Sequence, residues 1–388
     1  MNTWGNDNRG SALLITLAIM VLMTIAAILA VRTAQTDVDL SFNQLHTDQS
    51  FYIAEAGLAK AYLELTEDNE WTNGFNNVSF DQGTYSVAVI DSSNNTLLFD
   101  TIILRSTGSI RDANSNLEAL IVPEYWRPFQ YAMFGDSAIL MENSTCTDSY
   151  NSDSGSYATT VELTGGDVAS NGELDFINTA VIGGDISCAE EGGIFIDATC
   201  TVYGDTSSNI EPYVLETVPD SLYDWAQTVT PGETGMTGTY SYNPTTYALS
   251  MAINQTMTLS GGVYYFSSID IGNNSQLHVA AGEQVIIYLD GDFTVGENAS
   301  INTLGDAEDF LVFSRGSIFE LEESTDIHIA FYGPDTEFSL ANSGEYYGSI
   351  VSNSATVINA ACVHYDRSLA EYRGGKTGIM NMIAWKEI

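Results

Sequence analysis

Two carboxylates in the segment YLDGDF, Asp290 and Asp292, have the spacing in this sequence that best suits acid–base chemistry. Residues two apart in a strand share one face, and a pair of carboxylates on one face can hydrolyse a glycosidic bond. Gly291 lies between them, however, and favours a turn in which both side chains are solvated. We therefore expect the pair to be part of a turn rather than a catalytic site.

The serine and histidine residues give weaker indications of catalysis than this carboxylate pair. Ser137, in Gly135-Asp136-Ser137, has the neighbours of an esterase nucleophile, but no matching His–Asp pattern accompanies it. His278 and His328 follow equivalent polar turns, and we expect them to be stacked strand residues rather than ligands. His46 and His364 have no partner that the sequence identifies. We expect no catalytic residue and no enzymatic activity.

The four cysteines are Cys146, Cys188, Cys200 and Cys362. An exported chain meets oxidising conditions, which favour disulfides. Cys188 with Cys200 would close a short loop and leave Cys146 with Cys362, while two other connectivities stay open. Zinc is the weaker interpretation because there is no C-x-x-C spacing, so no metal site is expected.

The charge is strongly negative, with 51 acidic against 11 basic residues and a net charge of −40. This balance argues against binding to nucleic acid or to anionic lipid through a basic patch. We favour a solvated surface suited to saline surroundings over one that collects divalent cations. The known calcium-binding loop patterns are absent, so we expect no cofactor, with a divalent cation such as calcium as the alternative.

The elements that would carry these residues begin with a long helix. Residues 12–31 are apolar except for Thr16 and Thr24, and as a helix they would span about 30 Å, enough to cross a bilayer. No Gly or Pro occurs between Ser11 and Ala56, which predicts one uninterrupted helix over 11–65. Its second half carries an apolar stripe that we expect to be buried, formed by Val38, Phe42, Leu45, Tyr52, Ala56, Ala59 and Leu63.

Residues 1–10 are a short polar segment that ends in Arg9-Gly10. Together with RGSALLITLAIMVLMTIAAILAVRTAQ and the segment FYIAEAGLAKA at 51–61, this pattern resembles the N-terminus of type IV prepilins, most closely the PilX-like minor pilins. The resemblance covers residues 9 to about 65 and extends more loosely to about 122. It implies that residues 1–10 are a leader, which a prepilin peptidase removes between Gly10 and Ser11.

The fifth mature residue would be Ile15, where major pilins have a glutamate that is thought to neutralise a neighbour's N-terminus. PilX-like proteins and the tip pseudopilin of type II secretion systems also lack this glutamate, so Ile15 favours a tip or priming position. The resemblance implies other major and minor pilins and the inner-membrane pilus assembly platform as partners. It also implies a single-pass inner-membrane protein before assembly, which then lies in the pilus at the cell surface.

Residues 66–125 are predicted to form a polar loop and a small antiparallel meander, with turns at 91–95 and 111–116 and a pilin-like RSTGSI strand at 105–110. In pilin-like proteins such a sheet packs on the outer half of the helix. Pro123 and Pro128 indicate a boundary.

Residues 126–388 are predicted to be a separate acidic β domain. Gly-Asp pairs recur at 166–167, 184–185 and 204–205, and polar turns flanked by apolar residues begin at Ile271, Val295, Leu321 and Leu340. Irregular repeats near 20 residues indicate a β-helix or β-solenoid, with a β-sandwich as the alternative. A Pro-containing insertion is expected at 211–255, with one helix near SLYDWAQTV, and the tail after Arg367 is expected to be a last strand or cap.

These elements predict an α+β fold, in which a pilin-type helix and a meander precede a mostly-β domain. The expected function is that of a minor pilin in a type IV pilus or related filament. It would act in assembly or priming and present the β domain at the tip for adhesion. The alternatives are a pilin-anchored surface enzyme that acts on polysaccharide and a tip pseudopilin of type II secretion.

Overall fold

The computed structural model describes residues 9–68, 71–90, 101–373 and 376–388. The predicted turn at 91–95 and the predicted leader up to residue 8 lie outside these residues. The chain forms two compact units, Met1–Tyr125 with Gly375–Ile388 and Trp126–Gly374.

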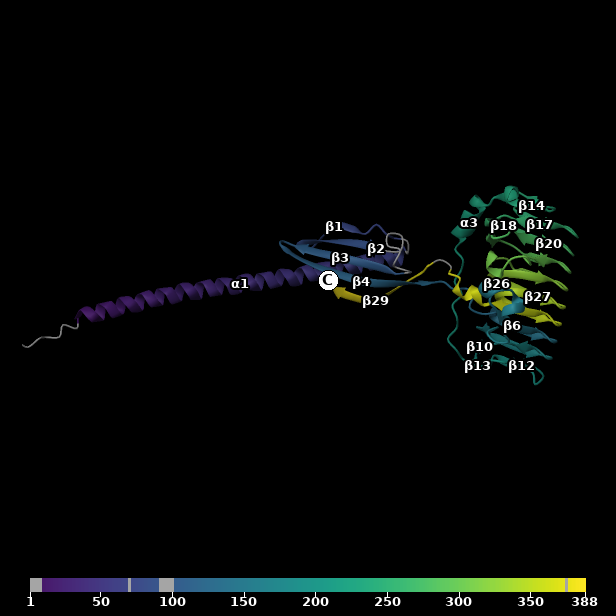
Figure 1. Cartoon of the computed structure of the whole chain (residues 1–388), viewed down its shortest axis with the longest axis horizontal. Helices are drawn as coiled ribbons and strands as arrows, with labels where there is room; N and C mark the ends of the chain where they lie inside the picture. Colours follow the sequence, from purple (N-terminus) through teal and green to yellow (C-terminus); the bar gives the residue numbers. More distant parts are fainter. Residues whose placement is uncertain (1–8, 69–70, 91–100, 374–375) are drawn as a thin grey trace, which may run out of the picture. The chain divides into compact units, whose positions relative to one another are not determined.

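The first unit is organised on helix α1, Arg9–Glu67, which is 59 residues long (Figure 1). This confirms the predicted uninterrupted helix, which has no glycine between Gly10 and Gly57 to interrupt it. Its apolar half, from Leu13 to Val31, is exposed along its whole length. An 18-residue window there has a mean hydropathy of 2.8, so the helix is long and apolar enough to cross a membrane.

A five-stranded antiparallel sheet packs on the second half of α1, in the order β1-β2-β3-β4-β29. The strands are β1 Phe75–Phe80, β2 Gly83–Ile90, β3 Ile102–Ile110, β4 Ala113–Tyr125 and β29 Lys376–Glu387. Strand β29 corrects the predicted domain 126–388, since it lies in this sheet and not in the β domain. Pairing with β4 satisfies backbone groups that would otherwise form an open sheet edge.

The face of α1 that packs on the sheet is not the predicted stripe. The sheet buries the face that carries Ile53, Ala54, Leu58, Ala61 and Leu65. Members of the predicted stripe such as Phe42 and Leu45 are exposed, and Tyr52 is 64% exposed. The buried face combines large apolar side chains with the small residues Ala54, Gly57 and Ala61, where the helix approaches the strands closely.

Two glycines show how close this approach is. A Cβ at Gly57 would lie 2.7 Å from Ser106 Oγ, and a Cβ at Gly108 would overlap the backbone of Ser50 and Ala54. Across this close contact, Ser106 Oγ donates a hydrogen bond to the carbonyl of Ala54, 2.7 Å away. The predicted RSTGSI strand therefore contacts the helix directly.

The second unit is a three-faced β-solenoid, in which strands three apart along the chain pair in parallel. This pairing confirms the predicted solenoid and excludes the sandwich, whose two sheets are antiparallel. Long strands turn the corners: β26 Asp326–Ala341 and β27 Glu345–Ile358 run along all three faces, and β5 Met133–Glu142 runs along two.

Apart from β14 Met236–Gly238 and β15 Ser241–Asn243, which pair antiparallel, the remaining strands each belong to one face. The first face holds β7 Val168–Ser170, β10 Ile186–Cys188, β13 Thr206–Ser208, β18 Gly262–Phe266, β21 Val285–Leu289 and β24 Phe310–Ser314. The second face holds β8 Glu173–Ile177, β11 Ile194–Ile196, β16 Ala248–Met251, β19 Ser268–Ile271, β22 Phe293–Val295 and β25 Ile318–Leu321. The third face holds β6 Cys146–Tyr150, β9 Val181–Ile182, β12 Thr201–Val202, β17 Thr256–Leu259, β20 Gln276–Val279, β23 Ser300–Ile301 and β28 Cys362–Asp366.

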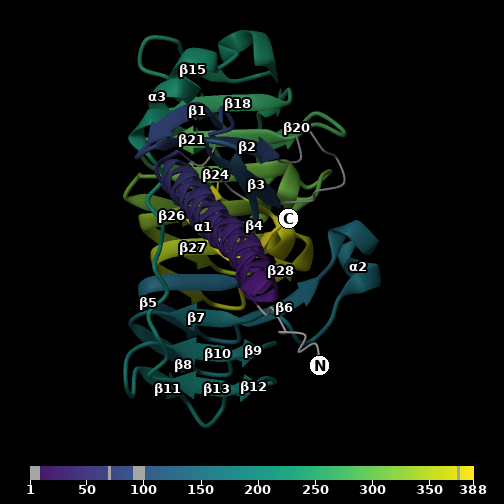
Figure 2. The same cartoon turned by 90° about the vertical axis from the view of Figure 1, so that its left-hand side faces the viewer.

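The coils are not stacked in chain order. A first stack, β5 to β13, runs from the middle of the solenoid to one end (Figure 1). The chain then crosses to the other end through residues 209–219 and helix α3, Asp220–Val229, and a second stack, β16 to β28, winds back to the middle. Figure 2 shows β27 next to β5, where the two stacks meet. The predicted helix near SLYDWAQTV is confirmed. The predicted insertion at 211–255 extends too far, because its residues 248–251 form β16, which belongs to a coil of the second stack.

The predicted repeats are the corners of the coils. In the second series Asn274, Asn298, Ser324 and Asn342 have φ between +52° and +60°, a left-handed conformation that asparagine adopts more readily than most residues. In the first series Asp167 Oδ1 accepts from the Asp185 amide at 2.8 Å, and Asp185 Oδ1 accepts from the Asp205 amide at 2.7 Å. Asp167 and Asp185 therefore each tie one coil to the next.

Apolar side chains fill the solenoid and also cover its first face. Inside, aromatic rings stack between coils, with Phe293 and Phe319 4.6 Å apart. Outside, helix α3 packs its Tyr223 and Ala226 on aromatic residues of the first face. The short helices are η1 Ser152–Ser154, α2 Tyr157–Thr160, η2 Gly232–Gly235, η3 Ala307–Asp309 and η4 Arg367–Glu371.

Candidate functional site: the seam of the solenoid

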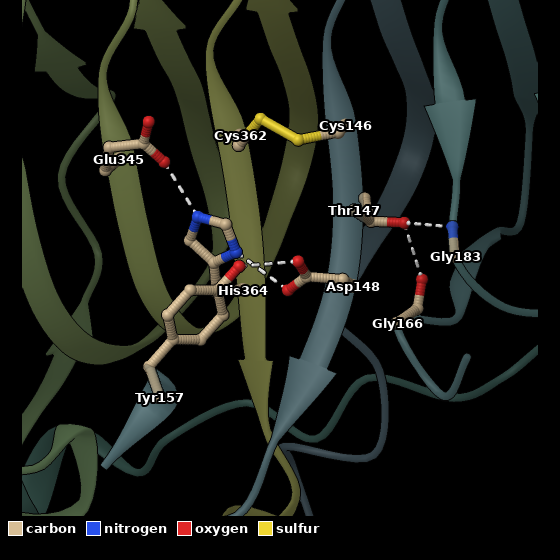
Figure 3. The surroundings of a disulfide bond; sticks show 9 residues. All are labelled: Cys146, Thr147, Asp148, Tyr157, Gly166, Gly183, Glu345, Cys362 and His364. Atoms are coloured by element: carbon tan, nitrogen blue, oxygen red, sulfur yellow. Dashed lines mark hydrogen bonds and ion pairs between the residues drawn. A yellow bond between two sulfur atoms is a disulfide. The ribbon is translucent and has the colours of Figure 1, made fainter. Parts of the chain in front are cut away.

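The seam is the junction at which β27 pairs with β5 and β28 pairs with β6. It joins the two stacks, so residues far apart in the sequence become neighbours. On the third face Cys362 pairs with Cys146 and His364 pairs with Asp148 in the strand register. Figure 3 shows these two positions side by side.

A disulfide connects Cys146 and Cys362, which are 216 residues apart. Cys188 and Cys200 are unpaired, so the structure does not contain the predicted bond between them. Cys188 ends β10 on the first face and Cys200 precedes β12 on the third, with β11 between them. The loop is short in sequence, but it passes around the solenoid and keeps the two thiols on different faces.

His364 is the central side chain of the seam and is only 5% exposed. Its Nδ1 lies 2.7 Å from Asp148 Oδ1 of β6, and its Nε2 lies 2.7 Å from Glu345 Oε2 of β27. Tyr157 of α2 lies over the site and donates a hydrogen bond to Asp148 Oδ2 at 2.7 Å (Figure 3). The ring of Tyr347 stacks on the imidazole with centroids 4.5 Å apart.

The two carboxylates decide the charge of the imidazole. Burial by itself lowers the pKa of His364, but the hydrogen bonds to Asp148 and Glu345 outweigh it and raise the pKa to about 8. The pKa of the Tyr157 phenol is raised by burial and by its hydrogen bond to Asp148, so it remains a donor. At neutral pH the site is therefore an imidazolium that donates to two carboxylates.

This arrangement is better suited to holding the two stacks together than to catalysis. Both ring nitrogens of His364 are engaged, which leaves no lone pair to accept a substrate proton. Among residues 9–373 that the structure describes, and in the described tail, no group of three or more His, Cys, Asp or Glu side chains is placed to hold a metal ion. The site links three strands from two stacks, and the hydrogen bonds of His364 join Asp148, Glu345 and, through Asp148, Tyr157.

The predicted carboxylate pair does not form a site. Asp290 is an ion-pair partner of Arg315 and accepts a hydrogen bond from Tyr265 Oη at 2.7 Å. Asp292 Oδ1 accepts from the amide of Ile318 at 3.2 Å. The two residues lie in the corner between β21 and β22, as the turn interpretation expected, and not on one strand face. Asp290 is half-buried in its ion pair, however, and is not the solvated side chain that this interpretation expected.

The other predicted residues are dispersed. Ser137 Oγ donates to the carbonyl of Asn353 at 3.0 Å. His278 and His328 lie in β20 and β26, in the stacked strand positions that their equivalent turns predicted. His328 lies 4.4 Å from the ring of Tyr347, which connects it to the seam through aromatic contact.

The processing residues lie at the start of α1. Gly10 and Ser11 belong to its first turn, and Ile15 is 58% exposed. Nothing in the sequence indicated that His364 would meet Asp148 and Glu345. The nearest signal was that His364 and Cys362 are two residues apart, as are Asp148 and Cys146, so each pair points to one face of its strand.

Comparison with known proteins gives distant likenesses. No curated protein matches the chain. A competence-associated pilin, ComZ, from Thermus thermophilus is 12% identical with a TM-score of 0.28, over 88% of this chain and 97% of that one. The DUF3494 domain of a Shewanella frigidimarina ice-binding protein is 12% identical with a TM-score of 0.38, over 63% of this chain and 98% of that one.

An ice-binding protein from an Antarctic bacterium of the Flavobacteriaceae is 13% identical with a TM-score of 0.34, over 63% of this chain and 47% of that one. These scores are too low to assign a function. Residues 240–372, about a third of the chain, match a family model described as "Domain of unknown function (DUF7305)". This match covers the whole of the second stack, β16 to β28, including its seam strands.

Proposed function

We propose that the chain is a minor pilin of a type IV pilus or a related filament, which presents the solenoid at the filament tip. The observation that carries this proposal is helix α1. One uninterrupted helix is apolar and exposed along its first half, and the second half packs one face on a small antiparallel sheet. Such a helix can lie in a membrane and later pack against other helices of its kind.

The exposed stripe on the second half of α1 supports the same proposal. Val38, Phe42, Leu45 and Tyr52 remain exposed although they are apolar or aromatic. An apolar stripe of this length on a monomer indicates a surface that another chain covers. In a filament the covering chains would be the helices of neighbouring major and minor pilins.

The proposed role is structural and not catalytic. Asp290, Asp292, Ser137 and His364 all make hydrogen bonds or ion pairs within the solenoid. The bulk of the solenoid favours the tip over repeated positions in a thin shaft. Ile15 favours the tip as well, because it replaces the glutamate that would neutralise the N-terminus of a neighbouring subunit. Before assembly the chain would be anchored in the inner membrane through α1, where a prepilin peptidase and the assembly platform would act on it.

Processing tests the first step of this role. Gly10→Val should block removal of residues 1–10, because prepilin peptidases cleave after a glycine. Gly5→Val makes the same chemical change away from the proposed cleavage point and should leave processing unchanged. Mass spectrometry of the membrane-extracted chain measures both. Equal processing of the two variants would contradict a prepilin.

Location tests the second step. Antibodies against the solenoid, used with immunogold labelling of intact cells, should decorate filament ends, and deletion of the chain should reduce the number of filaments. Labelling along the shaft would contradict a tip position. Filaments that are normal in number and never labelled would support the alternative role as a type II secretion pseudopilin.

A further inference from the structure

The two ends of the solenoid are built differently. At one end, strands β14 Met236–Gly238 and β15 Ser241–Asn243 pair antiparallel with β17 and β16. These antiparallel strands end the stack, since no further parallel coil continues from them. Tyr264 Oη donates to the carbonyl of Gly235 at 2.9 Å and ties the adjoining turn to the coil. This end is capped.

At the other end, the residues that the structure describes form no such cap. Strands β11, β12 and β13 form the last coil, and among the described strands they pair only with β8, β9 and β10 (Figure 2). On either side of β11, the Gly193 carbonyl accepts from the Leu174 amide and the Asp197 amide donates to the Phe176 carbonyl, which in the parallel register assigns the odd-numbered residues to the bonds with β8. The amides of Ile194 and Ile196 therefore point away from β8, as in any edge strand.

Apolar side chains are exposed with this edge. Ile196 occupies the position above Phe176, yet it is 36% exposed where Phe176 is 0% exposed, because no coil follows. Phe195, Tyr203 and Ile210 are also exposed near this end. Repeat proteins usually cover such an end with a polar capping unit. An uncovered edge with apolar side chains is a surface to which another strand can add.

The charge of the last coil indicates which kind of strand could bind to it. No Lys or Arg occurs between residues 128 and 314, so the last coil carries no basic side chain. Glu190, Glu191, Asp205 and Glu211 lie in or beside it and are exposed. A second copy of this end would bring the same negative charges together, whereas a basic segment would neutralise them.

We infer that the open end formed by β11, β12 and β13 binds an extended, positively charged segment of a partner protein by strand addition. Backbone hydrogen bonds to the outward amides of β11 would hold the segment, and its apolar side chains would cover Ile196. Its basic side chains would meet the glutamates of the last coil. This inference concerns the solenoid alone and holds whether or not the chain enters a filament.

The test uses the full chain in detergent micelles and a short synthetic peptide that alternates valine and lysine. We expect saturable binding by fluorescence anisotropy that weakens as salt rises. A peptide with glutamate in place of lysine should not bind. A valine–lysine peptide with alternate valines replaced by proline should bind at least about tenfold more weakly, because proline cannot donate to an edge strand.

Ile196→Pro removes an outward amide without breaking the bonds to β8, and should weaken binding of the valine–lysine peptide about tenfold. Ile253→Pro, at an exposed position near the capped end, is the matched control and should bind as the unmodified chain does. Equal binding of the proline and valine peptides would overturn the inference, since it would indicate charge attraction alone. Absence of binding would also overturn the inference. Self-association of the chain that Ile196→Pro abolishes would overturn it as well, because the partner would then be a second copy of this chain.

Discussion

At the scale of single residues, His364 shows how the seam obtains its cohesion. The imidazole lies between Asp148 and Glu345, which come from different stacks, so its positive charge attracts both sides of the junction. The ordinary pKa of a histidine is near 6.5, and here it is raised to about 8. A raised pKa means that the folded state binds a proton more tightly than the unfolded chain does.

The stability of the solenoid should therefore depend on pH in a defined direction. The contribution of His364 is fully present below about pH 6.5 and is lost as pH rises through about 8, and it amounts to about 2 kcal/mol. Urea unfolding monitored by tryptophan fluorescence at pH 6 and pH 9 measures the difference.

His364→Asn should remove this pH dependence. His278→Asn is the matched control: the pKa of His278 is lowered by burial, so its contribution is lost as pH falls and has the opposite sign. If the His364→Asn variant lost as much stability between pH 6 and pH 9 as the unmodified chain does, other titratable groups would cause the pH dependence.

At the scale of elements, the contact between α1 and its sheet depends on the absence of side chains. Gly108→Ala would place a methyl group against the backbone of Ser50 and Ala54, which cannot move aside as a flexible side chain could. We expect a loss of about 1–3 kcal/mol in the free energy of unfolding of the first unit. Ser109→Ala changes the neighbouring residue, on the other face of β3, and should have little effect.

Hydrogen exchange of α1 residues 50–65 measures this prediction, because weaker docking exposes the amides of the helix more often. Protection that is equal in the Gly108→Ala and Ser109→Ala variants would contradict the close approach of helix and strand.

The disulfide is the second device at this scale, since it fastens the two stacks of coils to each other. Cys146 and Cys362 close a loop over a separation of 216 residues, and long loops lose the most freedom in the unfolded chain. Cys146→Ser with Cys362→Ser should reduce the stability of the solenoid by about 2–5 kcal/mol.

Thermal unfolding of this double variant, compared with Cys200→Ser, measures the effect. Cys200 forms no disulfide, so Cys200→Ser should unfold near the temperature of the unmodified chain. If both variants unfolded at the same temperature, the bond would contribute nothing to the junction.

At the scale of the whole molecule, the negative charge opposes compaction. The solenoid, Trp126–Gly374, carries 35 acidic residues and four arginines and has no lysine. Repulsion among these charges destabilises the folded state, and salt screens it. We therefore expect the melting temperature to rise as sodium chloride is added, and to rise by a similar amount with magnesium or calcium chloride at equal ionic strength.

A much larger effect of calcium at low concentration would contradict simple screening and indicate that the acidic surface binds a divalent cation. Differential scanning fluorimetry across a series of ionic strengths measures both outcomes, with sucrose as an uncharged control.

The sequence by itself determined the local elements. The run without glycine or proline predicted α1 over its whole length, and the recurring polar turns predicted the corners at Asn274, Asn298, Ser324 and Asn342. It also predicted the boundary near residue 125. These features depend on periods of a few to about 20 residues, which a chain expresses in its own pattern.

Only the tertiary structure decided how these elements meet. The predicted stripe lies on the wrong face of α1 because apolarity alone does not show where the helix approaches the sheet closely, as it does at Ala54 and Gly57. The pairing of His364 with Asp148 and of Cys362 with Cys146 follows from a register set by the return of the second stack, 216 residues later. No local period records that register, since it arises only when the last coil of one stack meets the first coil of the other.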